Sequence, residues 1–489
     1  GRLPPLIVTT PATGVVAAVD LGAASGRVLV VAVGPTSLRW QEVHRFPNEP
    51  VELPDGLHWD ILRLYADVVE GLRRAALAES GVRSVGVDSW AVDYGLLDAA
   101  GRLLGNPYHY RDRRTEGADA IVHAAISREA HYARTGLQFL PFNTIYQLAA
   151  ARSTAEFAAA DRALLIPDLM GYWLSGLVAA EETNASTTGL YDPRLRTWAT
   201  DIAEAVGIRS SLLPDVVAPG SVRLPLRSRI LAATGLGPET ELVVVGSHDT
   251  ASAFVGTPLL DRDAVVISCG TWALVGMELD GPVLSEESRR ANFTNEAGVD
   301  GTVRYLRNVS GLWLLQESLR AWERAGRPAD LEALLQAAAE LPAGGPTVDP
   351  NDPIFLAPGD MESRIVELCR RTDQPPPTTR AGLVRCILDS LAAAFARTVE
   401  AVVRLSGRPA RRIHLVGGGS RNALLCQLTA DATGLPVVAG PAEATAIGNA
   451  LVQARTLGLV EGDLMTLRAV IRATQPLVTY EPRPRMLAS

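Results

Sequence analysis

The chain has 489 residues, which exceeds the size at which one hydrophobic core keeps growing, so we expect two large domains. Hydrophobic residues make up 47% of the sequence and charged residues 20%, a composition that excludes a disordered protein. The net charge of −8 argues against nucleic acid as a partner, because binding a phosphate backbone requires clustered Lys and Arg. A small phosphorylated ligand is compatible with this charge, since backbone amides and one or two arginines can bind it.

The cysteines and the first residues bear on where the protein works. Four cysteines form no CxxC pair and no metal-ligand spacing with histidine, so we expect unpaired thiols in a reducing compartment. Residues 1–14 hold three prolines and lack the charged-then-apolar pattern of a signal peptide. No apolar stretch is long enough to span a bilayer. The sequence therefore predicts a cytoplasmic protein without a membrane partner, and it leaves the oligomeric state open.

The first half of the chain opens with two apolar runs around a turn of small residues. Residues 15–22 and 28–33 are rich in β-branched side chains, which predicts a strand, a tight loop and a returning strand. A third strand is expected near residues 39–46. Apolar positions recur at helical spacing over residues 59–77, and residues 85–90 follow as a buried strand.

The second half repeats this device. Residues 265–276 again read as an apolar strand, a glycine-bearing turn and an apolar strand. A long helix is expected around residues 388–402, with Gly407 as its stop, and a strand at residues 413–416 leads into the glycine-rich run 417–422.

Two similar hairpins that open two halves indicate a duplicated α/β domain pair with a cleft between the copies. We place the boundary within residues 255–260, just before the second hairpin. The predicted division is an N-terminal domain of residues 1–257, with the sugar site and the first phosphate loop, and a C-terminal nucleotide-binding domain of residues 258–489.

Three glycine-bearing loops are candidates for binding phosphate, because the chain has no GxxxxGK[ST] sequence. In residues 20–27, small side chains let backbone amides approach a phosphate, and Asp20 could hold Mg²⁺ through water. Residues 268–272, with Thr271 as a donor, would face this loop across the cleft. Residues 417–422 join a strand to a helix and so present free amides to an anion. The structural alternative is a plain hairpin turn for the first two loops and a tight turn for the third.

An apolar strand delivers His248, Asp249 and Thr250 to its polar end, just before the expected boundary. A carboxylate there can accept the proton of a sugar hydroxyl as the γ-phosphoryl group departs. A histidine beside a substrate pocket more often orients or hydrogen-bonds than acts as the base. The structural alternative is that Asp249 caps a helix beginning at Thr250.

Carboxylate, amide and aromatic groups suited to a carbohydrate occur in residues 87–93, 110–113 and 142–147. Each of these groups could instead be a structural hydrogen bond or core packing. We assign half of them to that structural alternative.

Taken together, the motifs resemble those of the FGGY family of carbohydrate kinases. The similar stretches run from residue 15 to about residue 453, and the most specific are QFLPFNT at 138–144, SHDTAS at 247–252 and GLWLLQ at 311–316. The resemblance implies an α/β fold of two ribonuclease-H-like domains of the actin/hexokinase type. These domains would close an active-site cleft over ATP and a small sugar.

The resemblance also carries roles to single positions. Asp249 matches the catalytic base, and Asp20 matches the acidic residue that supports Mg²⁺ through water; Asp249 would also lie at the metal. The implied substrate contacts are Ala91, His248, Asp249, Thr250 and Asn308. The implied ATP contacts are Ala23, Ala24, Ser25, Gly26, Arg27, Thr271, Gln316 and Gly418. Two positions depart from the family pattern, since Ala91 replaces a substrate-contacting glycine and Ala24 replaces a serine.

Within the family, the motifs are most similar to those of kinases of L-rhamnulose, which implies transfer of the ATP γ-phosphoryl group to its 1-hydroxyl in rhamnose catabolism. The near alternative is another ketose, such as L-fuculose, L-ribulose or L-xylulose, because these sugars differ by one stereocentre or one methyl group. The alternative from another class is a non-catalytic sugar or nucleotide sensor on the same scaffold. A sensor could lose Asp249 and the sugar-side polar set, which are all present here.

Overall fold

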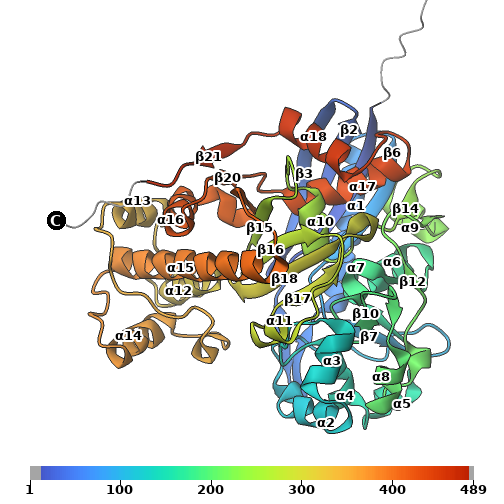
Figure 1. The fold of residues 1–489 in the computed structure, drawn as a ribbon. Helices are drawn as coiled ribbons and strands as arrows, with labels where there is room; N and C mark the ends of the chain where they lie inside the picture. Colours follow the sequence, from blue (N-terminus) through green and yellow to red (C-terminus); the bar gives the residue numbers. More distant parts are fainter. Residues whose placement is uncertain (1–12, 484–489) are drawn as a thin grey trace, which may run out of the picture.

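The computed structural model describes residues 13–483 and shows two lobes, each built around a β-sheet (Figure 1). Residues 1–12, which make up most of the segment considered above for a signal peptide, lie outside this description. Within residues 13–483, no helix combines the length and the apolar character needed to cross a membrane.

The first lobe contains a six-stranded sheet. Its strands, in spatial order, are β13 (Arg223–Pro225), β14 (Glu241–Val243), β6 (Val82–Ser89), β1 (Gly14–Leu21), β2 (Ser25–Gly34) and β3 (Ser37–Pro47). Strand β1 runs antiparallel to β2, which sets Asp20 opposite Arg27, and parallel to β6, which sets Asp20 opposite Asp88. The three strands predicted in residues 15–46 are therefore present. Their register brings two carboxylates together at the carboxyl ends of β1 and β6.

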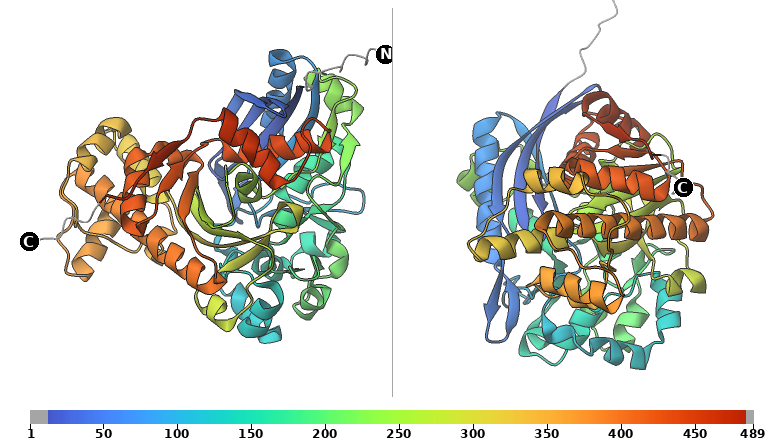
Figure 2. Two further views of the ribbon diagram at one scale, coloured as in Figure 1. Left: turned by 45° about the horizontal axis from the view of Figure 1, so that its top comes forward. Right: turned by 90° about the vertical axis from the view of Figure 1, so that its left-hand side faces the viewer.

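Alternating side chains of β1 serve two separate cores. Ala17 and Val19 belong to a buried cluster with helix α1 (Ile61–Ala78), whose apolar residues recur at the predicted helical spacing. Val16 and Ala18 belong to a cluster on the opposite face, with α17 (Ala444–Thr456) and α18 (Leu464–Thr474). Both further views show these two C-terminal helices lying over the first strands (Figure 2). The domain boundary within residues 255–260 remains a prediction. Helices α17 and α18 follow that boundary in the chain, yet they pack against the sheet of the first lobe.

The second lobe contains a seven-stranded sheet. Its strands, in spatial order, are β17 (Thr294–Ala297), β18 (Val303–Ser310), β16 (Trp272–Leu279), β15 (Ala264–Cys269), β19 (Arg412–Val416), β20 (Val437–Ala439) and β21 (Val478–Tyr480). Strand β15 is antiparallel to β16 and parallel to β19, as β1 is to β2 and β6. The repeated hairpin expected at residues 265–276 thus opens a second sheet with the same local pairing.

Helix α15 (Arg380–Ser406) packs its apolar residues into the core of the second lobe. It ends at the predicted stop, because Gly407 adopts the left-handed conformation (φ 68°) that closes a helix. It begins earlier than residue 388, since the Thr379 hydroxyl accepts a hydrogen bond from the amide of Gly382 and caps the first turn.

The remaining elements surround the two sheets. In the first lobe they are β4 (Pro50–Leu53), β5 (Gly56–Trp59), β7 (Tyr94–Leu97), α2 (Ala118–Ala125), α3 (Arg128–Thr135), α4 (Thr144–Ala151), α5 (Ala155–Ala159), β8 (Arg162–Leu165), α6 (Ile166–Ser175), β9 (Ala180–Glu181), α7 (Glu182–Ala185), β10 (Tyr191–Asp192), β11 (Thr197–Trp198), α8 (Thr200–Ala205), β12 (Val216–Val217), α9 (Ser228–Thr234) and α10 (Asp249–Val255). In the second they are α11 (Glu286–Arg290), α12 (Trp313–Arg324), α13 (Leu331–Ala339), α14 (Met361–Arg371) and α16 (Ala423–Thr433). Short 3₁₀ turns are η1 (Arg113–Thr115), η2 (Ser210–Leu212), η3 (Val299–Gly301), η4 (Pro353–Phe355) and η5 (Gly418–Arg421).

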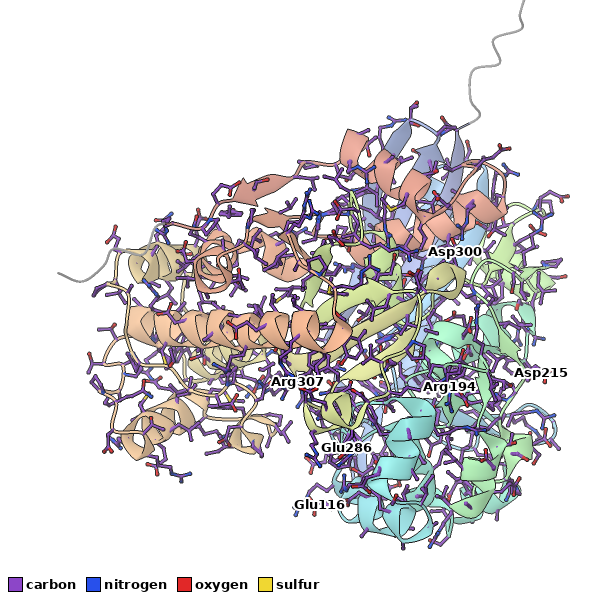
Figure 3. All side chains as sticks on the ribbon, in the orientation of Figure 1. Glu116, Arg194, Asp215, Glu286, Asp300 and Arg307 are labelled. Carbon is purple, nitrogen blue, oxygen red and sulfur yellow. The ribbon has the colours of Figure 1, made fainter. Side chains whose placement is uncertain are left out.

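The lobes meet through close backbone contact and through an ion pair at the surface. Helices α10 and α17 cross so tightly that a methyl group added to Gly448 would lie 1.8 Å from the carbonyl oxygen of Ser252. Asp300 of η3, labelled in Figure 3, forms two hydrogen bonds of 2.7 Å with Arg455 of α17. Lower in the same view, Glu286 marks α11, which lies beside α3 and contacts the first lobe there. The lobes are therefore in contact at three separate places.

Candidate active site

A cavity of about 400 Å³ lies where the hairpin turns of the two sheets face each other. It is lined by nearly every residue predicted for catalysis, substrate or nucleotide binding. These are Asp20, Ala23, Ala24, Ser25, Arg27, Ala91, His248, Asp249, Thr250, Thr271, Asn308, Gln316 and Gly418. Gly26 does not line the cavity, because its Cα faces the ring of Phe46, which an added methyl group would approach to 2.2 Å. Residues far apart in the chain are thus assembled into one site.

Three carboxylates, those of Asp20, Asp88 and Asp249, lie near one another at the end of the first sheet. Asp20 accepts hydrogen bonds from Nε and Nη2 of Arg27 at 2.9 and 2.7 Å, both on Oδ2. Asp88 is fully buried and accepts one hydrogen bond of 2.6 Å from Asn449 of α17, and no partner within residues 13–483 reaches its Oδ1. Burial and the nearby charge of Asp20 raise the pKa of Asp88 well above its usual value. This concentration of carboxylates favours a bound cation or proton.

Asp249 occupies the first position of α10, one residue earlier than the capping alternative requires. The N-cap is His248, and its side chain makes no capping hydrogen bond, so the structural alternative in which Asp249 caps a helix beginning at Thr250 is wrong. The Asp249 side chain is 31% exposed and lines the cavity. Its Oδ1 atom lies 3.3 Å from Nε2 of His248 and accepts a 3.2 Å hydrogen bond from the Thr250 hydroxyl. Burial raises the pKa of Asp249, although His248 opposes the shift, so the carboxylate is a stronger base than a free one.

Gln138 and Asn308 supply amide groups to the wall of the cavity. Gln138, from a loop of the first lobe, accepts hydrogen bonds from the backbone amide and Nδ2 of Asn308 at 2.8 and 3.0 Å. Next to Ala91, Val92 has φ 70°, a strained conformation for a β-branched residue that occurs mainly where a site constrains the backbone. Gln138 was not singled out from the sequence, although it begins the motif at 138–144. Its role as a bridge depends on Asn308, which is 170 residues away.

Two side chains weighed as sugar ligands belong to the core instead. Asp93 accepts hydrogen bonds from the indoles of Trp59 and Trp90 at 2.6 and 3.0 Å and from the side-chain amide of Gln147 at 2.7 Å. Neither Asp93 nor Gln147 lines the cavity. Burial raises the pKa of Asp93 to about 6 despite these donors. Both groups follow the structural alternative considered for them.

The two loops of the second lobe that reach the cavity are packed against each other. A methyl group added to Gly419 would lie 2.6 Å from Sγ of Cys269, whereas nothing lies within 4 Å of one added to Gly418. Thr271, in the turn between β15 and β16, donates a 3.1 Å hydrogen bond to Gln316 of α12. The cavity therefore meets the backbone of η5 at Gly418, while Gly419 allows the turn and η5 to touch.

The donor set at the end of the first sheet fits Mg²⁺. This ion prefers oxygen ligands and usually keeps several waters beside one or two carboxylates and phosphate oxygens. Asp20 and Asp249 line the cavity, and the Arg27 hydrogen bonds occupy only one oxygen of Asp20. Within residues 13–483, no group of three or more His, Cys, Asp or Glu side chains is arranged to hold a metal ion. The two cavity-lining carboxylates match the sparse protein ligation that Mg²⁺ accepts.

Family models agree with this architecture. The model described as the FGGY family of carbohydrate kinases, N-terminal domain, matches residues 15–256, and its C-terminal counterpart matches residues 265–457. The chain belongs to the FGGY family of carbohydrate kinases. The predicted family and the predicted α/β fold of two actin/hexokinase-like domains are thereby confirmed.

Alignments with related proteins cover nearly the whole length of this FGGY kinase. Rhamnulokinase of Bacteroides thetaiotaomicron is 41% identical over 468 residues, covering 95% of both chains. Rhamnulokinase of Pectobacterium carotovorum is 43% identical over 472 residues, covering 96% of this chain and 93% of that protein. Among solved structures, ligand-bound xylulose kinase of Lactobacillus acidophilus gives a TM-score of 0.79 at 17% identity, over 96% of this chain and 94% of that chain. The structure of glycerol kinase of Plasmodium falciparum with ADP gives a TM-score of 0.74 at 15% sequence identity, again over 96% of this chain and 94% of that chain. The structural likeness shows a shared fold.

Proposed function

We propose that this FGGY kinase transfers the γ-phosphoryl group of ATP to the 1-hydroxyl of L-rhamnulose, yielding L-rhamnulose 1-phosphate and ADP in cytoplasmic rhamnose catabolism. The substrate is inferred from curated relatives named rhamnulokinase, which are 39–43% identical over nearly their whole length. The observation that carries the chemistry is the position of Asp249, in one cavity with the sugar-side groups and the three phosphate loops. The other ketoses and the non-catalytic sensor are not favoured.

In this proposal Asp249 is the base. The Thr250 hydroxyl and His248 Nε2 both lie at Oδ1, so Oδ2 is the oxygen left to accept the proton of the sugar hydroxyl. As that proton moves to Asp249, the hydroxyl oxygen forms a bond to the γ-phosphorus, and the bond from this phosphorus to the β,γ-bridging oxygen breaks. ADP departs with the bridging oxygen. Ala91, His248, Thr250 and Asn308 would hold the sugar in line for this transfer.

The phosphates would be held mainly by backbone amides. The turn at Ala23 to Ser25, Thr271 and Gly418 line the cavity from three sides. Arg27 stays charged, because Asp20 and Glu443 raise its pKa although burial opposes the shift. Its Nη1 atom lies 2.6 Å from Glu443, so this guanidinium also fixes Asp20 in place. Gln316 completes the proposed nucleotide contacts.

We also propose Mg²⁺ as the cofactor, with Asp20 acting through water and Asp249 nearby. A bound Mg²⁺ would neutralise part of the phosphate charge that accumulates during transfer. Asp20 and Arg27 would keep one carboxylate oxygen directed at the cavity.

The proposal is tested by ADP release from the purified full chain with ATP and Mg²⁺. L-rhamnulose, L-fuculose, L-ribulose, L-xylulose and glycerol are offered separately, beside an Asp249→Asn control. We expect the highest kcat/KM with L-rhamnulose and almost no activity in the control. A higher kcat/KM with another ketose would change the substrate and retain the kinase, whereas no stimulation by any sugar would favour the sensor.

A further inference from the structure

A buried group of charged side chains stands directly behind Asp249. Arg304 of β18 is completely buried, and Glu296 lies opposite it on β17 in the antiparallel register. His248 is 5% exposed and lies between this pair and Asp249. Burying an arginine costs free energy unless its charge is balanced and its hydrogen-bond donors have acceptors. We therefore ask what Arg304 does at this position.

The Arg304 guanidinium is fixed by partners from separate segments. Nε donates to the carbonyl oxygen of Ala297 at 3.0 Å, and Nη2 donates to the carbonyl oxygen of Thr183 at 3.2 Å. Nη1 lies 3.1 Å from Nδ1 of His248 and 3.0 Å from Oε2 of Glu296. Burial alone would raise the pKa of Glu296, but Arg304 and His248 lower it below its usual value, so Glu296 balances the charge of Arg304.

The contact between Arg304 and His248 determines which imidazole nitrogen carries hydrogen. A guanidinium only donates hydrogen bonds, so the Nδ1 atom it faces has to accept with its lone pair. With Nδ1 as the acceptor, the ring hydrogen resides on Nε2, which lies 3.3 Å from Oδ1 of Asp249. The alternative tautomer would place the Nε2 lone pair against the Asp249 carboxylate. Nδ1 also lies 3.4 Å from Oε2 of Glu296, but Nη1 of Arg304, at 3.1 Å, is nearer and supplies the hydrogen of this contact.

The backbone of His248 is held by the same segment that holds Arg304. The amide of His248 donates to the Thr183 hydroxyl at 3.2 Å, and this hydroxyl donates to Glu181 at 2.6 Å. Glu181 is completely buried and also accepts hydrogen bonds from the amide and hydroxyl of Ser247 at 2.9 and 2.8 Å. Since Thr183 contacts both Arg304 and the His248 backbone, the ring and the guanidinium keep a fixed separation.

We propose that Arg304 is a positioning residue for phosphoryl transfer. It fixes His248 in the tautomer that carries its hydrogen on Nε2, 3.3 Å from Oδ1 of Asp249, and this orients the carboxylate with Oδ2 available to the sugar hydroxyl. The inference rests on the proposed role of Asp249 as the base. The fold supplies a matched control in Arg468 of α18, which is also buried and ion-paired, with hydrogen bonds of 3.0 and 2.7 Å to Glu278. Arg468 does not line the cavity.

The first test is long-range ¹H–¹⁵N NMR of the full chain labelled at its 7 histidines, with His248 assigned by its loss in His248→Gln. We expect hydrogen on Nε2 of His248 in the parent. In Arg304→Met, the donor is gone and Nδ1 is free to donate to Glu296, so the signals should move toward the Nδ1–H pattern. Arg468→Met should leave them unchanged. Hydrogen on Nδ1 in the parent would overturn the inference.

The second test is steady-state kinetics on the same variants. Arg304→Met should lower kcat by about 10-fold to 100-fold, the scale of a displaced catalytic group, with the KM for ATP nearly unchanged. Arg304→Lys keeps a donor and should recover part of kcat, whereas Arg468→Met should lose stability and keep kcat. Parental kcat in Arg304→Met would overturn the inference. If Arg304→Met does not fold, the parental NMR pattern and Arg304→Lys decide. If the parent consumes no ATP with any sugar, the proposed function fails, and the NMR test still decides the tautomer.

Discussion

The two hairpins that face the cavity share their pairing pattern but differ in chemistry. In the first lobe, Asp20 lies two residues before the turn glycine Gly22, beside Arg27 and Asp88 on the neighbouring strands. In the second lobe, Ser268 lies two residues before Gly270, beside Leu274 and Val416. One strand end is therefore strongly acidic, and the equivalent strand end is neutral.

This difference teaches that the fold provides two similar scaffolds and that a few side chains assign their tasks. An acidic end suits a cation and proton transfer, whereas a neutral end lets backbone amides contact phosphate without repulsion. The predictions below test this division of labour, beginning with the largest expected effect.

Asp249→Asn should abolish most activity, because an amide cannot accept the sugar proton. We expect kcat to fall by about 100-fold to 10,000-fold, the usual contribution of a general base. Thermal unfolding should change little, since the replacement has the same shape and Asp249 is partly exposed to the cavity. Parental kcat in this variant would falsify the role of Asp249 as the base. Proton transfer would then no longer distinguish the acidic strand end of the first sheet from the neutral strand end of the second.

Asp20→Asn and Ser268→Ala probe equivalent positions of the two strands. We expect the first change to lower kcat by about 100-fold, as the loss of one electrostatic contact to a transferring group does. The second should lower it less than about 10-fold, the range of a single neutral hydrogen bond. Titration of each variant with Mg²⁺ in the ADP-release assay measures both effects. Equal losses of kcat in the two variants would mean that the two strand ends do not have different roles.

Gly419→Ala and Gly418→Ala probe the backbone of the neutral end. The first substitution forces a methyl group to 2.6 Å from Sγ of Cys269, so we expect a loss of about 1–3 kcal/mol in the free energy of unfolding. The second has open space and should keep the stability while raising the KM for ATP. Denaturant unfolding and ATP titration separate these results. A stable Gly419→Ala variant would contradict the close packing of the two loops.

Ala91→Gly should give the smallest effect. It restores the residue of the family pattern beside the sugar and removes one methyl group, so we expect changes below about 10-fold in relative kcat/KM among the ketoses. Parallel kcat/KM measurements on the ketose panel provide the comparison. A complete switch of preferred sugar would show that Ala91 itself selects the substrate.

Local sequence signals predicted much of the fold. The hairpins and α15 with its stop at Gly407 follow from alternation, helical spacing and turn residues, which act over short distances. The hairpin of β4 and β5 was missed because the four residues of β4 are exposed and lack an apolar face. The start of α10 was placed one residue late, since His248 is an unusual N-cap without a capping hydrogen bond.

The site was harder to predict where contacts span long distances. Asp93 looked like a sugar ligand, and only the fold shows that two indoles surround its carboxylate. Glu296 lines the cavity and was missed as a site residue, because no local signal in the sequence distinguishes it. Its importance depends on Arg304 across a strand pair and on His248 from the other lobe. The spacing of residues in the sequence does not show that these side chains are in contact.

The two helices that cover β1 have a consequence for synthesis on the ribosome. Val16 and Ala18 are among the first described residues to be translated, yet their core partners include Ile447 and Leu467, more than 400 positions later. One apolar face of the first sheet therefore waits for almost the entire chain before it is covered. Covering this face so late slows folding and lengthens the time during which its apolar side chains can cause aggregation. The nascent N-terminal half depends on the last helices to bury that face.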